Sequence, residues 1–95
     1  MLLQVVVVKW KEDADPDLIK EFLAFAPTAM ERGPFRSYTE GATVGVMASS
    51  WDWGFVAELE RPEDVDVWIN CDAHVELNEK IKPIRGEVCN IQLPR

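Results

Sequence analysis

The sequence has very few residues of the kinds that bind metals. It contains one histidine, His74, and two cysteines, Cys71 and Cys89, with no CxxC pair. Structural and catalytic zinc sites need a cluster of thiolate or imidazole ligands, so we expect neither a metal nor another cofactor. Two cysteines do not make the disulfide framework of a secreted domain, although a disulfide between them stays open, and we expect both to be small buried apolar residues.

Long hydrophobic runs and an excess of basic residues are also absent. No apolar stretch approaches the ~20 residues that cross a bilayer, and the opening MLLQVVVVKWK is too short and too strand-like for a signal peptide. The chain contains ten Lys and Arg residues and seventeen Asp and Glu residues, which gives a net charge of -7. Such a chain repels phosphate backbones and anionic lipids. We therefore expect a cytoplasmic protein that binds neither nucleic acid nor membranes.

The composition is that of an ordinary folded domain. Hydrophobic residues make up 47% of the 95 residues and charged residues make up 28%. No repeat, linker or low-complexity segment divides the chain, so we expect a single domain over residues 1–95.

The first half of the sequence predicts a strand followed by a helix. Leu2 to Lys11 is β-branched, and its four consecutive valines indicate a strand that is apolar on both faces. Asp15 and Pro16 are typical of a helix N-cap and first helical position. Apolar residues then recur at helical spacing to Met30, and Pro27 is expected to kink this helix or end it early.

The remaining elements complete a β-α-β-β-α-β order. They are a strand at Phe35–Thr43, a hairpin connection at Gly41–Asp52, a strand at Trp53–Leu59, a short helix after Pro62, a further helical turn capped by Asp72, and a strand at Val88–Leu93. This order is typical of the ferredoxin-like α+β fold, in which both helices cover one face of a four-stranded antiparallel sheet.

The uncovered face of such a sheet predicts a homodimer. It would expose members of Val5 to Val8 and of the third strand, namely Trp53, Phe55, Ala57 and Leu59. An apolar patch of that size is rare on a soluble monomer. A second copy packing sheet against sheet around a two-fold axis would bury it.

Three segments carry a resemblance to a known family. VVVVKWK is similar to the family's opening strand, WDWGFVAELE followed by RPEDV is similar to its third strand and next helix start, and WINCDAHVELNEKIKPI is similar to a segment with a histidine that runs into Lys-Pro. In this order the segments resemble the stress-responsive dimeric α+β barrel (Dabb) family over essentially the whole chain. The resemblance implies a dimer whose two sheets form a shared barrel, with a pocket in each protomer between sheet and helices.

The family includes plant stress proteins and olivetolic acid cyclase, an enzyme that closes a linear polyketide by aldol condensation. By this resemblance His74 stands at the position of the cyclase's base, and Trp68 stands at the position of its tyrosine. Gln4 stands where many members have a histidine. The residue that corresponds to the aspartate orienting the base is either Asn90 or Gln92.

The position of His74 also suggests its chemistry directly. A histidine in the first turn of a helix lies at the positive end of the helix dipole, and partial burial removes water from its ring. Both effects lower the pKa of the imidazole. We therefore expect a neutral ring at pH 7, which is the form that a general base needs, with Asn90 or Gln92 hydrogen-bonded to one ring nitrogen. The alternative is a core histidine satisfied by an amide or a backbone carbonyl, which is the more common role of a lone histidine without a carboxylate partner.

Aromatic residues predict a pocket for a small apolar or aromatic ligand. We expect Trp10, Phe22 and Trp68 to line it, together with the polar Gln4, Asn90 and Gln92. Phe25 is a fourth aromatic candidate. Filling the core is the alternative role of all four residues, and it is the favoured role for Phe22 and Phe25. Tyr38 is the one phenol, so it is either a substitute proton donor or a surface residue.

Three functions are compatible with these residues. The first is a cofactor-free cyclase, isomerase or lyase acting on a small carbonyl compound, with His74 as general base. The second is a carrier that only binds a small apolar molecule. The third is a structural stress protein in which side chains fill the space. The polarity and openness of the pocket distinguish the three.

Overall fold

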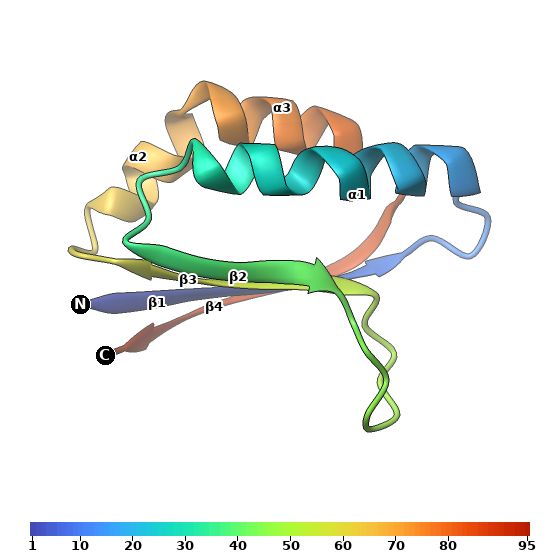
Figure 1. Cartoon of the computed structure of the whole chain (residues 1–95), viewed down its shortest axis with the longest axis horizontal. Helices are drawn as coiled ribbons and strands as arrows, with labels where there is room; N and C mark the ends of the chain where they lie inside the picture. Colours follow the sequence, from blue (N-terminus) through green and yellow to red (C-terminus); the bar gives the residue numbers. More distant parts are fainter.

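The computed structural model describes residues 1–95. Its elements are β1 (Leu2–Trp10), α1 (Pro16–Glu31), β2 (Ser37–Ala42), β3 (Trp53–Leu59), α2 (Asp64–Asn70), α3 (Asp72–Ile81) and β4 (Arg85–Pro94). The strands form one antiparallel sheet in the order β2-β3-β1-β4, and the helices lie together on one side of it (Figure 1). The predicted ferredoxin-like fold is thus confirmed, with the second helical region divided into α2 and α3 at Cys71.

The buried core lies between the helices and one face of the sheet. Val6 and Val8 of β1 face the helices, and Phe55 and Trp53 pair with them on β3. Ala57 and Leu59 follow on the same face, and all of these side chains are buried. The prediction that the Trp53 to Leu59 set lies on the uncovered face is therefore wrong. Alternation separates the two faces of a strand, but it does not tell which face the helices cover.

The opposite face of the sheet is apolar and has nothing packed on it in the single chain. Its centre is Val5, which pairs with Val56 on one side and Ile91 on the other. Val56 is 43% exposed and Ile91 is 44% exposed. Alternation along the three strands places further residues on this face, which we call the bare face: Leu3, Val7, Cys89 and Leu93.

Helix α1 begins as the sequence predicts and continues further than expected. The Asp15 side chain accepts a hydrogen bond from the backbone N–H of Asp17 at 2.9 Å, and Pro16 is the first helical residue. The helix passes through Pro27 and ends at Glu31, so the predicted early end is wrong. Residues on both sides of the proline are buried in the core and hold the two parts in line: Phe22, Ala26, Ala29 and Met30.

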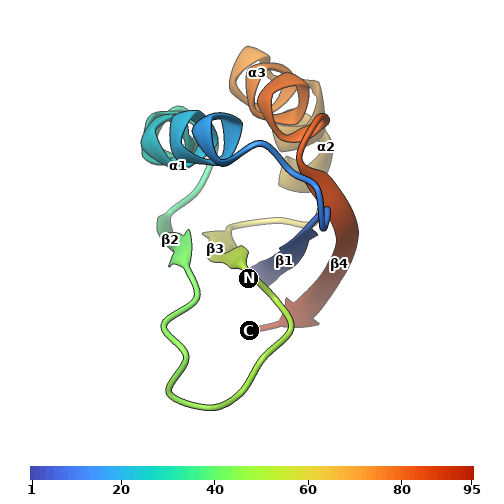
Figure 2. The same ribbon diagram turned by 90° about the vertical axis from the view of Figure 1, so that its right-hand side faces the viewer.

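The connection between β2 and β3 extends away from the helices. It leaves the sheet on the side of the bare face (Figures 1 and 2). Its base is fixed by Asp52, whose backbone N–H donates to the Val8 carbonyl and whose carboxylate accepts from the Trp10 N–H, both at 2.8 Å. Three apolar side chains in this loop are more than 80% exposed: Val44, Val46 and Met47.

Both cysteines are free thiols. Cys71 is half-buried where α2 meets α3, but Cys89 is exposed, so the prediction that both are buried is wrong for Cys89. The reason is the position of Cys89 on β4, where its side chain joins the bare face. No helix of the chain is long and apolar enough to span a membrane.

Candidate functional site

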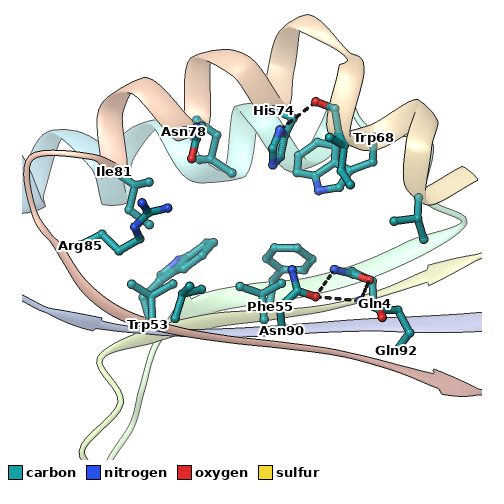
Figure 3. Close-up of a pocket in the computed structure, with 16 residues that line it drawn as sticks. Gln4, Trp53, Phe55, Trp68, His74, Asn78, Ile81, Arg85, Asn90 and Gln92 are labelled. Atoms are coloured by element: carbon teal, nitrogen blue, oxygen red, sulfur yellow. Dashed lines mark hydrogen bonds between the residues drawn. The ribbon is translucent and has the colours of Figure 1, made fainter.

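A cavity of about 520 Å³ lies between α2 and α3 on one side and the sheet on the other. Its size is within the range of about 300–1,000 Å³ that is typical of small-molecule sites. Helix α3 packs along α1, and the cavity lies beneath α2 and α3, where helix-facing side chains of β4 line it (Figure 3). Ten of its sixteen lining residues are hydrophobic.

His74 lines this cavity from the helical side (Figure 3). It is the third residue of α3, where the chain turns from α2, and its ring is half-buried. The Trp68 ring packs edge-on against the imidazole, with 5.0 Å between the ring centroids and an angle of 70° between the planes. Trp68 is itself 3% exposed, so the imidazole rests on a fixed wall.

A backbone carbonyl determines which nitrogen of His74 carries the proton. Nδ1 lies 3.0 Å from the carbonyl oxygen of Ile69. Because a carbonyl oxygen only accepts hydrogen bonds, Nδ1 must be the protonated nitrogen, and Nε2 keeps its lone pair in the neutral ring. The predicted partner, Asn90 or Gln92, is wrong, because the ring bonds a carbonyl in the last turn of α2. A backbone carbonyl is the partner expected in the alternative role of a core histidine. Nε2 has no hydrogen-bond partner within the protein.

Burial lowers the pKa of His74 below the usual 6.5, and the hydrogen bond to Ile69 opposes this to a smaller degree. Desolvation penalises the charged imidazolium, whereas the Nδ1–H donor bond favours it. The net direction agrees with the sequence prediction of a lowered pKa. The ring is therefore neutral at pH 7 with Nε2 as a free acceptor.

Three amide side chains form a connected cluster on the sheet side of the cavity (Figure 3). Gln4 donates through Nε2 to Asn90 Oδ1 at 2.7 Å and accepts from Gln92 Nε2 at 2.8 Å. Gln92 Nε2 also donates to Asn90 Oδ1 at 2.8 Å. Gln4 is only 3% exposed, and these bonds satisfy it. The Nδ2 group of Asn90 makes no hydrogen bond within the protein, so the cluster retains one free donor.

The structure brings together most of the residues that the sequence nominates. Gln4, Trp68, His74, Asn90 and Gln92 all line the cavity. Whether they bind or convert a ligand stays a prediction.

Trp10 and Phe22 do not line the cavity, which corrects their predicted place. Phe22 is fully buried beneath α1, between Trp10 and Trp53, at centroid distances of 5.7 and 5.0 Å. Phe22 belongs to the core and Trp10 packs against it. Both lie away from the cavity because α1 covers the β3 side of the sheet, away from β4 (Figure 2). Tyr38 is also outside the cavity; it is exposed on β2 beside Phe35.

Two polar residues of the cavity are not predicted from the sequence. Asn78 follows His74 by one helical turn, and that spacing alone would have placed it on the same face. Arg85 also lines the cavity, from the first position of β4. The sequence predicts this strand only from Val88, so Arg85 falls in the preceding connection. No sequence pattern therefore places its side chain at the cavity.

The site offers a free basic nitrogen on one wall and a free amide donor on the other. These are the two groups that an acid–base reaction at a carbonyl compound requires. No group of three or more His, Cys, Asp or Glu side chains is arranged to hold a metal ion.

Comparisons with solved structures identify the fold. No family model and no curated protein matches the sequence. The chain is similar to a dimeric ferredoxin-like protein of unknown function from Thermobifida fusca, with a TM-score of 0.84, 17% identity, and coverage of 97% of this chain and 88% of that one. It is similar to a Dabb family protein from Mesorhizobium loti, with a TM-score of 0.78, 14% identity, and coverage of 99% and 95%. The chain has the ferredoxin-like fold of these two proteins.

The same fold occurs in an enzyme. Hydroxynitrile lyase from Passiflora edulis aligns with a TM-score of 0.75 and 11% identity, over 97% of this chain and 90% of the lyase. At such identities the similarity establishes the architecture and carries no catalytic residue across. The resemblance to the Dabb family is confirmed, and it rests on the fold.

Proposed function

We propose that the protein binds a small carbonyl compound in this cavity and removes a proton from the carbon beside the carbonyl, with His74 as general base and without a cofactor. The observation that carries the proposal is the bond from His74 Nδ1–H to the Ile69 carbonyl. It leaves Nε2 unprotonated and unpartnered in a cavity of suitable size. The occurrence of a lyase with this fold supports an enzymatic role.

The proposed reaction uses groups on opposite walls. Nε2 takes the proton, the C–H electron pair forms a carbon–carbon double bond, and the carbonyl electrons move to oxygen to give an enolate. The free N–H of Asn90 hydrogen-bonds this oxygen, which stabilises the charge where it develops. The imidazolium then returns its proton to a different carbon of a conjugated enolate, or to the alkoxide formed when the enolate attacks a second carbonyl of the same molecule. The first outcome is an isomerisation, and the second is a cyclisation.

Proton exchange tests this function without knowledge of the natural substrate. We expect the protein to accelerate loss of the α-proton signal from at least one of acetophenone, phenylacetone and pentane-2,4-dione in D2O, measured by proton NMR. His74→Ala is expected to reduce this rate by about 10²- to 10⁴-fold, the usual contribution of a general base. Val75→Ala is the matched control, because Val75 is the next residue of α3 and is 51% exposed.

An equal exchange rate in His74→Ala and the wild type would contradict the proposal. A second candidate function, a non-catalytic carrier, is favoured by the predominantly hydrophobic lining. The carrier function predicts that the wild type and His74→Ala bind such ketones with similar affinity, and that neither exchanges protons faster than buffer.

We further propose that the protein acts as a homodimer joined through the bare face. The proposal is supported by the apolar centre at Val5, Val56 and Ile91 and by the dimeric state of the Thermobifida fusca protein. Charged pairs lie at the two ends of this face: Lys9 with Glu87, and Glu58 with Arg36 and Arg95. An apolar centre with a polar rim is typical of protein interfaces.

The loop between β2 and β3 supports the same assembly. The loop carries the exposed Val44, Val46 and Met47 and extends on the bare-face side (Figure 1), where a second sheet would lie beside it. In a two-fold pair each loop would cover the edge of the partner. The cavity of each protomer lies on the helical side of its sheet, opposite the bare face. This pairing therefore leaves both cavities open to ligand.

A further inference from the structure

Arg85 is the only arginine of the chain without a carboxylate partner. Arg32, Arg36, Arg61 and Arg95 each lie within ion-pair distance of an aspartate or glutamate, whereas Arg85 makes no ion pair and no side-chain hydrogen bond. Arg85 is half-buried and lines the cavity, at the end opposite the amide cluster (Figure 3).

The absence of a partner is informative in a chain of this composition. Acidic residues outnumber basic ones by seventeen to ten, so carboxylates are abundant around most cations. A guanidinium that has lost part of its hydration without gaining a partner leaves strong hydrogen-bond donors unused. Its planar arrangement of N–H groups fits a carboxylate through two parallel hydrogen bonds. Asn78, on the helical wall near Arg85, also has a side-chain amide without a hydrogen bond in the protein (Figure 3).

We infer that the natural ligand of this cavity is a small organic carboxylate, whose anionic end binds Arg85 and whose apolar or aromatic body lies along the hydrophobic lining. One guanidinium neutralises one carboxylate, whereas a phosphate monoester would keep a further negative charge in a largely apolar cavity. The inference rests on the proposed function for the placement of the carbonyl, which lies between His74 and Asn90. The substrate class is then a carboxylic acid with a second, reactive carbonyl group.

Matched ligands that differ only in charge test the role of Arg85. Benzoate, phenylacetate and 3-phenylpropanoate are compared with their neutral carboxamides, with tryptophan fluorescence and calorimetry as readouts. The wild type is expected to bind at least one carboxylate about ten- to a hundredfold more tightly than its amide, the usual effect of a charge-assisted hydrogen-bonded pair. Arg85→Gln is expected to abolish this preference, and Arg85→Lys to retain part of it.

Arg61→Gln is the control, because Arg61 is an exposed arginine paired with Asp64 at the start of α2. It is expected to keep the wild-type preference. Equal affinities of the wild type for acids and amides, an unchanged preference in Arg85→Gln, or no binding of any of these carboxylates at millimolar concentration would each overturn the inference. Circular dichroism of each variant excludes unfolding as the cause of a loss.

These outcomes are distinct from a failure of the proposed function. Ligand binding requires no proton transfer, so a carboxylate preference that depends on Arg85 can persist even if no ketone exchanges its protons. Conversely, the wild type could show no preference for carboxylates while Arg85→Gln exchanges the protons of a neutral ketone at the wild-type rate. That result would support His74 as general base and contradict the anion site at Arg85.

Discussion

Two opposing effects meet on the ring of His74. Burial beneath α3 disfavours the imidazolium, and the hydrogen bond to the Ile69 carbonyl favours it, with burial the larger effect. The same carbonyl fixes the tautomer, so protonation state and orientation are set together. The junction of α2 and α3 at Cys71 makes this possible, because it brings the last carbonyls of one helix beside the first turn of the next.

The lowered pKa predicts how the stability of the protein depends on pH. In the unfolded chain His74 titrates near its usual 6.5, and in the folded protein it titrates lower. Below pH 6.5 the unfolded state therefore binds more protons, and the free energy of unfolding decreases as the pH falls through the folded pKa. At about pH 7.5 and above, one pH unit over the usual pKa of His74, the ring is almost entirely neutral in both states and makes little pH-dependent contribution.

Urea denaturation between about pH 5 and pH 8 measures this effect by comparison with His74→Gln. The carboxylates titrate in both proteins, so the difference between the two curves isolates the histidine. We expect a constant difference above about pH 7.5 and a relative loss of wild-type stability as the pH falls below that value. Parallel curves over the whole range would contradict the lowered pKa.

The sequence identifies much of the candidate site but not the contacts inside it. Helical spacing places His74 on the inner face of α3, and the strand period places Gln4, Asn90 and Gln92 on one face of the sheet. The partner of His74 is not predictable in this way, since it is a backbone carbonyl five residues earlier whose direction depends on where α2 ends. The prediction that Trp10 lines the cavity is wrong for a similar reason, because it depends on which part of the sheet α1 covers.

At the scale of elements, the bare face is the clearest feature without a partner in the single chain. Val5 occupies its centre, between β3 and β4. A lysine there would place a charge in the middle of the proposed interface, where it has no partner and loses its water.

Val5→Lys is therefore expected to run as a monomer of 10.8 kDa in light scattering, and the wild type is expected to have twice that mass. Val67→Lys is the matched control, because Val67 is 51% exposed on α2 in the helical layer, and this variant should remain a dimer. Ile91→Lys repeats the test from β4 if Val5→Lys does not fold. A dimeric Val5→Lys of native secondary structure, or a monomeric wild type, would remove the proposed interface.

The elements themselves are largely predictable because their signals are local. The N-cap Asp15, the alternation from Trp53 to Leu59 and the valine-rich first strand each determine an element by short-range preferences. The residues at which an element begins and ends are harder to predict from the sequence. Helix α1 passes Pro27 because buried residues anchor it on both sides. Strand β4 begins at Arg85 because it pairs with β1 along its length. Both depend on contacts with distant segments.

At the scale of the whole molecule, the layer of helices and the sheet have separate roles. Helix α1 closes the core over one side of the sheet, and α2 and α3 leave a cavity beside β1 and β4. The opposite face remains free for assembly. Pairing through that face would therefore not obstruct the cavity, so one small chain can provide both an interface and a site.

A general base at His74 requires an accessible, unprotonated Nε2 in the folded molecule at neutral pH. Since the chain contains one histidine, nitrogen-15 NMR of the labelled protein observes a single imidazole without any assignment problem. We expect a protonated Nδ1 and an unprotonated Nε2 at pH 7, with a titration midpoint below 6.5. A ring protonated on Nε2 at pH 7, or a midpoint above 6.5, would contradict the assignment of His74 as the general base.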